Sequence, residues 1–442
     1  MKPPRPWPQA LLWLAFLGPF FFLTYGWVNA YTARLPHVGS VVFGWEKHIP
    51  FLPWTIVPYM ALDAFYAGSL LLCRTRAELH TQGQRLLLAS ALSVAGFLAF
   101  PLQFSFARPA THGFNGFLFA ALAGFDKPYN QAPSLHVSLA LLVGLGWCRH
   151  LRGAWRWLAA GWFGLIALSV LTTYQHHFID VVGGAAVGVL CVYLLPLRGW
   201  QPAQLPTATT RPRRRQLAAA YALGAALALG AAAALKDWAW LLLWPATSLA
   251  LVALAYACIG PAIFQKRRDQ LSWAARLLLA PYLVGAWWSS RWFTRRQLPS
   301  REVAPGIWLG RAPGRADWRH LRPGAVLDLT AEFSQRPALR RLRRRHVPLL
   351  DLVPPTPSQL AQAVAALDAL LPHAPVLVHC ALGYSRSAVV VAAWLLHRGR
   401  AATAAEAAAQ VRAAQPRVVL GPAHLAALAA YHTTYSQPIT YA

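Results

Sequence analysis

The C-terminal part of the chain places a cysteine six residues before an arginine. Cys380 follows the apolar residues 376–379, and Arg386 opens a second apolar run after a turn that contains Gly383. A loop between a strand and a helix points backbone N–H groups and the positive helix N-terminus into one concavity, which favours an anion. These dipoles and the Arg386 guanidinium also stabilise a thiolate. The spacing therefore predicts a cysteine nucleophile beside a phosphate-binding loop.

The residues around this nucleophile suit phosphoryl transfer. Arg386 can form two parallel hydrogen bonds to phosphoryl oxygens, which a lysine does less well. Ser387 is placed to donate a hydrogen bond to the sulfur when it leaves phosphorus. The predicted phosphate-binding residues of this loop are Ala381, Leu382, Gly383, Tyr384, Ser385 and Ser387.

The stretch HCALGYSRS resembles the H-C-x5-R-[S/T] signature of the dual-specificity branch of the cysteine-based phosphatases. The resemblance extends upstream through EVAPGIWLGRAP and AVLDLTAEF and covers about residues 301–442. It implies a phosphocysteine intermediate, no metal, no cofactor, and a general acid about thirty residues before the cysteine, where HVPLLDLVPPTP supplies Asp351. The alternative interpretation is that Asp351 caps a turn before Pro354 and Pro355.

A second set of reactive residues lies in the first half of the chain, at the ends of apolar runs. His176 and Asp180 are four residues apart in YQHHFIDVVGG, so on one helix they share a face and the carboxylate can orient the imidazole. His136 lies in QAPSLHVS. One histidine can attack phosphorus while a second protonates the leaving group. The alternative is that these histidines are interfacial residues bound by backbone carbonyls, which is the better interpretation for His177.

PSLH followed by H-x3-D resembles the type 2 phosphatidic acid phosphatase superfamily, a six-span bundle, over about residues 43–197. The motif PSLH and the stretch IPFLPWTIVPYM resemble the sequences of one branch of this superfamily, which contains the inositol-phosphoceramide and sphingomyelin synthases. The resemblance implies that His176 is the nucleophile, Asp180 its partner and His136 the general acid.

Two basic positions of that superfamily are absent here. Pro101 stands where the Lys-x6-Arg-Pro motif has lysine, and Val170 stands where Ser-Arg-x5-His has arginine. Their absence disfavours simple monoester hydrolysis and leaves phosphodiester exchange open, with Arg108 and Lys127 holding the head group.

Composition predicts that much of the chain lies in lipid. The 442 residues are 57% hydrophobic and 12% charged, whereas soluble chains carry roughly 25% charged residues. The net charge of +27 comes from cations that fall mostly between apolar runs, which is the pattern of topology signals and of attraction to anionic lipid. We therefore expect a lipid bilayer as partner and no nucleic acid.

The apolar runs predict eight membrane-spanning helices, namely a six-span core and two further spans. They lie near residues 11–30, 51–73, 86–106, 134–147, 157–174, 178–197, 217–235 and 238–259. Basic loops such as 211–215 and 266–268 then lie on one side, which the positive-inside rule makes the cytoplasm. The loops that carry the histidines face the periplasm.

The predicted domains follow from these patterns. Residues 1–200 form the membrane domain, 201–270 a basic linker with two further spans, and 271–297 an interfacial or re-entrant helix, with a ninth span as the alternative. Residues 298–442 form an α/β domain with a central sheet, because the short strands IWLG, GAVLDLT, HVPLLDL and PVLVHC alternate with helices at 357–371 and 386–398.

These features predict a bifunctional multi-pass protein of a bacterial inner membrane. The favoured substrate of the cysteine site is a phospholipid or phosphoinositide-like head group, and the alternative is a phosphoprotein. A third hypothesis makes the membrane half a catalytically silent anchor or lipid sensor. The oligomeric state and the lipid stay open.

Overall fold

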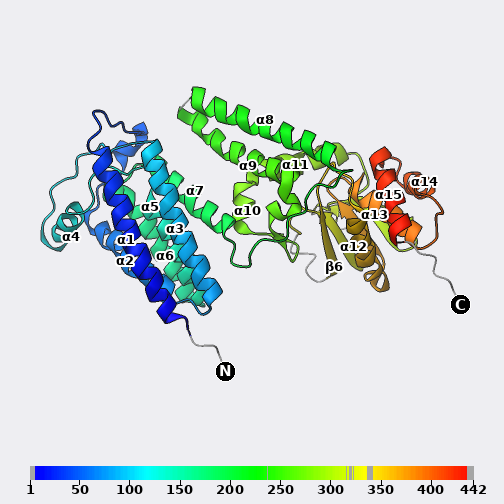
Figure 1. The fold of residues 1–442 in the computed structure, drawn as a ribbon, viewed down its shortest axis with the longest axis horizontal. Helices are drawn as coiled ribbons and strands as arrows, with labels where there is room; N and C mark the ends of the chain where they lie inside the picture. Colours follow the sequence, from blue (N-terminus) through cyan, green and yellow to red (C-terminus); the bar gives the residue numbers. More distant parts are fainter. Residues whose placement is uncertain are drawn as a thin grey trace. The chain divides into compact units, whose positions relative to one another are not determined.

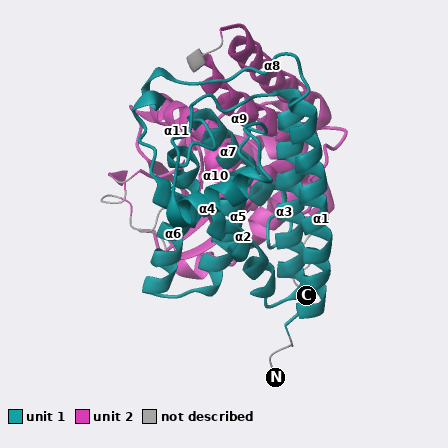
Figure 2. Cartoon of the chain, turned by 90° about the vertical axis from the view of Figure 1, so that its left-hand side faces the viewer, with its two compact units in different colours: residues 1–199 teal, residues 200–442 magenta. Residues whose placement is uncertain are grey.

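The computed structural model describes residues 5–235, 237–314, 316–317, 321, 323–335 and 342–435. They form two compact units, Met1–Gly199 and Trp200–Ala442 (Figure 2).

Unit 1 is a bundle of α-helices (Figure 1). Its α-helices are α1 (Trp7–Thr32), α2 (Ile56–Leu71), α3 (Arg76–Ala99), α4 (Gly113–Ala123), α5 (Leu135–His150), α6 (Ala154–Thr172) and α7 (Phe178–Leu194), with short 3-10 helices η1 (Gly44–His48) and η2 (Pro53–Thr55).

Helices α5 and α7 meet at their N-terminal ends, and this contact brings the histidines together. Ser134 caps α5 by accepting a hydrogen bond from the Val137 N–H. At Gly184 of α7, an added Cβ would lie 2.3 Å from the Ser134 carbonyl oxygen. Small residues let helix backbones approach closely in membrane proteins. Glycine at 184 is therefore needed for α7 to pack against the start of α5.

Among the described residues, four helices are long and apolar enough to cross a membrane: Trp7–Thr32, Ala154–Thr172, Arg211–Leu235 and Ala239–Phe264. Helices α2, α5 and α7 have 16, 16 and 17 residues, which is short of the roughly 20 that span the hydrocarbon. The helical character of the region before the catalytic domain is confirmed, and the count of eight spans stays a prediction.

Unit 2 begins with a helical hairpin and two further helices. Its elements before the catalytic sheet are α8 (Arg211–Leu235), η3 (Asp237–Leu242), α9 (Leu243–Leu254), the π-helical turn η4 (Ala255–Ile259), η5 (Gly260–Phe264), β1 (Lys266–Arg267), β2 (Gln270–Leu271), α10 (Trp273–Leu278) and α11 (Ala280–Thr294).

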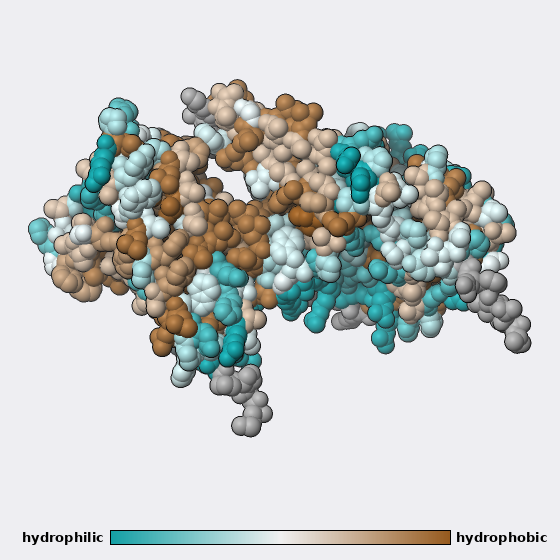
Figure 3. All heavy atoms as spheres, viewed as in Figure 1, coloured by the Kyte–Doolittle hydropathy of each residue, from teal (hydrophilic) through white to brown (hydrophobic). Residues whose placement is uncertain are grey.

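The hairpin of α8 and α9 leaves large apolar side chains exposed. They include Leu223, Leu227, Leu241 and Trp244, and α11 adds Trp287, Trp288 and Trp292. Figure 3 shows mostly tan and brown, apolar surface over α8 and α9, whereas hydrophilic residues gather near β6. This pattern fits a hairpin in lipid and an aromatic helix at the interface. The break between α10 and α11 falls beside Pro281, where the sequence analysis places a single interrupted helix.

The rest of unit 2 is a five-stranded mixed sheet covered by helices. The strands are β3 (Ser300–Ala304), β4 (Ile307–Arg311), β5 (Ala325–Thr330), β6 (Arg343–Leu349) and β7 (Val376–Cys380). The helices are α12 (Pro357–Asp368), α13 (Arg386–His397), α14 (Ala404–Ala414) and α15 (Pro422–Tyr435), with the turn η8 (Leu371–His373).

Strand order in this sheet is β3-β4-β7-β5-β6. Strands β4, β7, β5 and β6 are parallel, and β3 pairs antiparallel with β4. The carboxyl ends of the four parallel strands therefore meet at one edge, and β7, which ends at Cys380, lies in the middle. Both faces of β5 and β7 are buried, which explains their continuous apolar sequences.

The predicted α/β fold of this region is confirmed. The four predicted strands correspond to β4, β5, β6 and β7, and the two predicted helices to α12 and α13. Strand β3 was not predicted, because its sequence SREVA is charged and lies at the edge of the sheet.

Candidate active sites

The cysteine lies in a turn between β7 and α13. Cys380 is 3% exposed, and its Sγ accepts a hydrogen bond from the Gly383 N–H at 3.2 Å and lies 3.2 Å from the Ser387 Oγ. Gly383 has φ +80°, and an added Cβ would lie 2.7 Å from the Gly310 carbonyl carbon. Only glycine allows the turn to pass this close to β4. The turn thus directs the Gly383 N–H at the sulfur.

Arg386, the first residue of α13, is fully buried beside this turn. Its guanidinium donates two hydrogen bonds to Glu332, at 2.9 and 2.7 Å, and one to the Leu349 carbonyl at 3.1 Å. It also forms an ion pair with Asp351 at 3.2 Å. The structure therefore brings the predicted residues Arg386 and Asp351 into direct contact next to Cys380.

Asp351 follows β6 in a loop that ends at α12. Its side chain is 31% exposed, so the carboxyl reaches the surface of the site. Burial of most of the group raises the pKa of Asp351 above its ordinary value, and the Glu332 carboxylate adds to this rise while Arg386 opposes it. A raised pKa keeps a carboxyl protonated to higher pH, which suits a general acid.

Glu332 was missed by the sequence analysis. It lies two residues after β5, in the stretch DLTAEF, and is 4% exposed. Because β5 neighbours β7 in a parallel sheet, residues that follow the two strands meet at the same edge. The available signal was an acidic residue directly after a buried strand of the catalytic sheet. Glu332 fixes the plane of the Arg386 guanidinium, which must be oriented to bind two phosphoryl oxygens.

The remaining predicted residues of the loop are Ala381, Leu382, Tyr384 and Ser385. The Tyr384 hydroxyl donates a hydrogen bond to the Phe293 carbonyl at 3.2 Å, at the end of α11. The Ser385 Oγ lies 2.9 Å from the His424 Nε2. The side chains of Tyr384 and Ser385 therefore contact protein groups, which leaves backbone N–H groups of the turn as the phosphate donors.

A buried lysine from outside the catalytic sheet lies near the cysteine. Lys266 of β1 is 1% exposed and donates to Asp328 Oδ2 at 2.6 Å and to the Thr330 carbonyl at 2.6 Å. Asp328 is 3.9 Å from the His379 Nε2. Burial alone raises the pKa of Asp328, but the Lys266 ammonium, together with His379 and His346, outweighs burial and holds that pKa well below its usual range.

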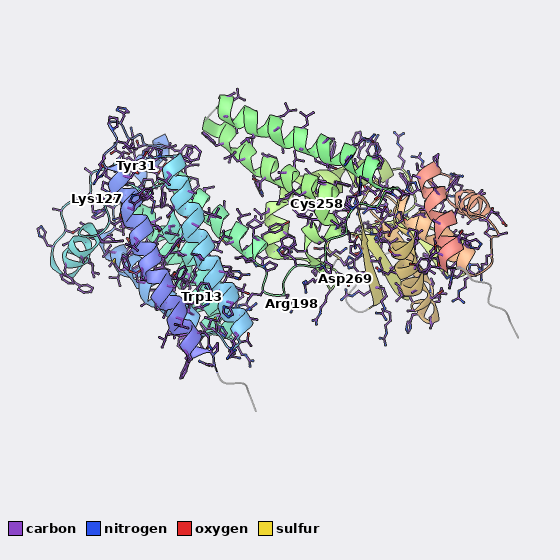
Figure 4. All side chains as sticks on the ribbon, viewed as in Figure 1. Trp13, Tyr31, Lys127, Arg198, Cys258 and Asp269 are labelled. Carbon is purple, nitrogen blue, oxygen red and sulfur yellow. The ribbon has the colours of Figure 1, made fainter. Side chains whose placement is uncertain are left out.

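The short hairpin of β1 and β2 is attached to the catalytic sheet in two places. Asp269, labelled in Figure 4, forms an ion pair with Arg344 of β6 at 2.9 Å, and its carbonyl accepts a hydrogen bond from the Gln335 N–H at 2.8 Å. Together with the bonds of Lys266 to Asp328 and Thr330, these contacts join the hairpin to β5, to the segment that follows β5, and to β6.

His136 and His176 of unit 1 line the same cavity, which has a volume of about 270 Å³. His136, at the start of α5, stacks on Tyr59 with ring centroids 3.9 Å apart, and its Nε2 has no hydrogen-bond partner among the described residues. His176, before α7, is 6% exposed. Asp126 also lines the cavity and accepts a hydrogen bond from the Tyr25 hydroxyl at 2.9 Å. The two predicted histidines are thus brought together.

Asp180 lies 3.6 Å from the His176 Nδ1, which is longer than a hydrogen bond. Its Oδ2 instead accepts the His177 N–H at 2.8 Å and caps α7. The His177 Nδ1 is 3.1 Å from Glu46, and its Nε2 is 3.2 Å from the Ser105 nitrogen. His177 is therefore held by its neighbours, in line with its structural interpretation.

The two predicted cations of unit 1 lie outside the cavity lining. Arg108 donates to the Tyr174 carbonyl at 3.3 Å and lies over the Phe119 ring at 5.0 Å. Lys127 lies in the loop after α4 with its side chain exposed (Figure 4). Neither contacts His136 or His176 among the described residues. Across the described part of the chain, no group of three or more His, Cys, Asp and Glu side chains could hold a metal ion.

Comparison with known families covers both sites. A family described as "Dual specificity phosphatase, catalytic domain" matches residues 319–434, and one described as "PAP2 superfamily" matches residues 57–194. The chain joins a PAP2-superfamily domain to a dual-specificity phosphatase catalytic domain. The phosphatase match contains Asp351, Cys380 and Arg386, and the PAP2 match contains His136 and His176.

Solved structures similar to the dual-specificity phosphatase domain include Tk-PTP in the active form, with 22% identity over 31% of this chain and 97% of that one, at TM-score 0.29. PTPMT1 in complex with PI(5)P has 20% identity over 30% of this chain and 95% of that one, at TM-score 0.28. Human DUSP28 has 24% identity over 30% and 93%, at TM-score 0.26. No curated protein matches the chain.

Proposed function

We propose that the C-terminal domain hydrolyses phosphomonoesters of phospholipid or phosphoinositide-like head groups through a phosphocysteine intermediate. The observation that carries the proposal is the arrangement of Cys380, Arg386 and Asp351, with the sulfur accepting a backbone N–H and the guanidinium in contact with the carboxyl.

The chemistry has two steps. The Cys380 thiolate attacks phosphorus, an S–P bond forms, and the P–O bond to the alcohol breaks while Asp351 gives its proton to the leaving oxygen. A water molecule then attacks phosphorus, Asp351 takes its proton, and the S–P bond breaks to release phosphate and the thiolate. Ser387, 3.2 Å from the sulfur, donates a hydrogen bond to it as it leaves. Arg386 binds the charge that spreads over the phosphoryl oxygens in both transition states.

A substrate at the membrane surface is supported by the contact between the phosphate loop and α11. The Tyr384 hydroxyl of the loop donates a hydrogen bond to the Phe293 carbonyl, and two exposed tryptophans lie nearby on the same helix: Trp292 directly precedes Phe293, and Trp288 lies about one turn earlier. Exposed tryptophans favour the lipid interface. The cysteine thus lies beside an element suited to that interface, where a lipid head group is close and a protein substrate must approach from the cytoplasm. A phosphoprotein substrate remains the second candidate.

The histidine site is proposed to act on a second class of phosphate ester. Among the described residues, its cavity is lined by His136, His176, Asp63 and Asp126 and by no lysine or arginine. A dianionic monoester needs cations, whereas a phosphodiester carries a single negative charge. This supports a phosphodiester-exchange role, with His176 as nucleophile and His136 as acid, in a six-span core.

The proposed location is a bacterial inner membrane, with the dual-specificity phosphatase domain in the cytoplasm and the histidine site in the periplasm. A fluorescent reporter fused to the C-terminus should be bright. Activity of an alkaline phosphatase fusion at the same place would contradict this orientation.

The phosphocysteine can be tested directly by trapping. Labelled substrate mixed with the detergent-purified protein and rapidly quenched should label a peptide that contains Cys380, and Ser387→Ala should increase the label by slowing its release. Cys380→Ser should remove the label, and Cys258→Ser, at an exposed cysteine of the same unit, should leave it unchanged. Label that appears only on a peptide containing His176 would overturn the assignment.

A further inference from the structure

The loop that carries Asp351 is held by the helical hairpin that precedes the catalytic domain. The Tyr256 hydroxyl, in η4 at the end of α9, donates a hydrogen bond to the Asp351 carbonyl at 3.1 Å. Arg213, near the start of α8, donates from Nε to the Leu352 carbonyl at 3.4 Å. Two consecutive carbonyls of the acid loop are therefore bonded by groups from the two helices of the hairpin.

The position of Tyr256 is itself fixed by buried contacts. Arg214 is 5% exposed and donates to the Tyr256 carbonyl at 2.8 Å and to the Ala255 carbonyl at 3.0 Å. The Tyr256 ring is 2% exposed and stacks on Tyr221 of α8, with centroids 5.5 Å apart. The π-helical turn at η4 shifts Tyr256 out of the regular helical position, and such turns are frequent at functional sites.

The acid loop needs external support because its backbone is unusual. Leu352 has φ +58°, a left-handed conformation that costs a non-glycine residue free energy, and its side chain is 50% exposed. Before the loop, Arg386 donates a hydrogen bond to the carbonyl of Leu349, the last residue of β6. Within the loop, Tyr256 and Arg213 bond the carbonyls of Asp351 and Leu352. These bonds hold the backbone on both sides of the carboxyl that must reach the leaving oxygen.

We infer that Tyr256 and Arg213 are positioning residues for the general acid, so that the α8–α9 hairpin forms part of the phosphatase active site. The inference rests on the proposed function of Asp351. The hairpin contains two of the helices that are long and apolar enough to cross a membrane. The position of these two helices therefore determines where the Asp351 carboxyl lies.

The test compares aryl phosphates whose leaving groups differ in pKa, with the full-length protein in detergent. Protonation of the leaving oxygen matters for phenyl phosphate and much less for 4-methylumbelliferyl phosphate, whose leaving group is a weaker base. Tyr256→Phe and Arg213→Ala should each lower kcat/KM on phenyl phosphate, with the double variant falling about tenfold, a part of the roughly 10²–10⁴ that a general acid contributes. We compare kcat/KM because it reports departure of the leaving group and not the later hydrolysis of the phosphocysteine, which both substrates share. On the activated ester, kcat/KM should change by less than about twofold.

Matched controls separate positioning from general damage. Arg215→Ala changes an exposed arginine of the same helix. Tyr221→Phe removes a tyrosine hydroxyl but keeps the ring that stacks on Tyr256. Neither should alter the ratio of the two kcat/KM values. In an Asp351→Asn background, Tyr256→Phe should have no further effect on phenyl phosphate, because a residue that acts through Asp351 has nothing left to position.

Each result bears on a different claim. An equal fall on both substrates, no fall on either, or a Tyr256 effect that persists in Asp351→Asn would overturn the positioning role. If Asp351→Asn itself lowers kcat/KM equally on both substrates, the assignment of Asp351 as general acid fails.

Discussion

The cysteine site and the histidine site of this chain meet phosphate charge in opposite ways. At the cysteine site, the Arg386 guanidinium is fully buried and its orientation is fixed by two hydrogen bonds to Glu332. At the histidine site, Arg108 bonds a backbone carbonyl outside the cavity lining. For the proposed functions, this difference suits the first site to a dianion and the second to a ligand that carries less negative charge.

Both sites contain buried nitrogens that lack a hydrogen-bond partner among the described residues. At the cysteine site, the Cys380 Sγ accepts an N–H, whereas the Arg386 Nε has no partner. At the histidine site, the His136 Nε2 and the His176 Nδ1 have none. Unbonded imidazole nitrogens in a cavity are available to a ligand.

The largest expected effect comes from replacing the guanidinium of the cysteine site. Arg386→Lys should lower kcat on phosphomonoesters by about 10²–10³, because lysine cannot make the two parallel bonds to phosphoryl oxygens or to Glu332. Steady-state kinetics with phenyl phosphate measures it. A change of less than about fivefold would mean that the bidentate geometry is not used in the transition state.

The buried ion pair between Lys266 and Asp328 should contribute strongly to the stability of unit 2. Lys266→Met leaves Asp328 buried without its cation and should destabilise unit 2 by about 3–5 kcal/mol. Thermal unfolding at pH 7 measures the loss, and Asp328→Asn in the same chain should recover part of it. Because Lys266 holds the pKa of Asp328 below its usual range, the pair's contribution is present near neutral pH and is lost as the pH falls through that lowered pKa. A Lys266→Met variant as stable as the wild type would contradict the account.

The pH dependence of the cysteine site should follow Asp351. Its raised pKa means that the carboxyl stays protonated to higher pH than an ordinary aspartate, and its function as acid is lost as the pH rises through that value. We expect kcat on phenyl phosphate to fall on the alkaline side and Asp351→Asn to remove this limb. An unchanged alkaline limb in Asp351→Asn would assign it to another group.

The smallest effect is expected at Arg108. Since it lies outside the cavity lining, Arg108→Ala should lower activity of the histidine site by less than about tenfold, compared with the 10²–10³ predicted for Arg386. Phosphodiester exchange in lipid vesicles measures it. A fall in activity as large as that expected for Arg386→Lys would show that Arg108 binds the phosphate. The two sites would then not differ in their use of arginine.

Most residues of the two candidate sites could be predicted from the sequence, because they lie close together in short motifs. The run from His379 to Ser387 combines strand, turn and helix start in one continuous segment, and the spacing of His176 and Asp180 is likewise local. Asp351 was found by its place in a family pattern. Strand order could not be read in this way, and neither could Glu332, whose contact with Arg386 depends on β5 and β7 being neighbours.

The contacts of the hairpin were also beyond the sequence. Lys266 reads as one more cation of a basic loop, although its ammonium is buried against Asp328. Tyr256 reads as one aromatic residue of an apolar run, although its hydroxyl bonds the acid loop. Such roles depend on which segments fold against one another, and a single polar residue in an apolar run carries no local sign of its partner.

The measurement that tests the central claim most directly is phosphate release from lipid phosphomonoesters and a phosphotyrosine peptide by the detergent-purified protein. Wild type is compared with Cys380→Ser and His176→Ala. We predict that lipid monoester turnover is lost in Cys380→Ser and retained in His176→Ala. Lipid turnover lost only in His176→Ala, with peptide turnover lost only in Cys380→Ser, would contradict the account and make the protein two independent phosphatases with separate substrates.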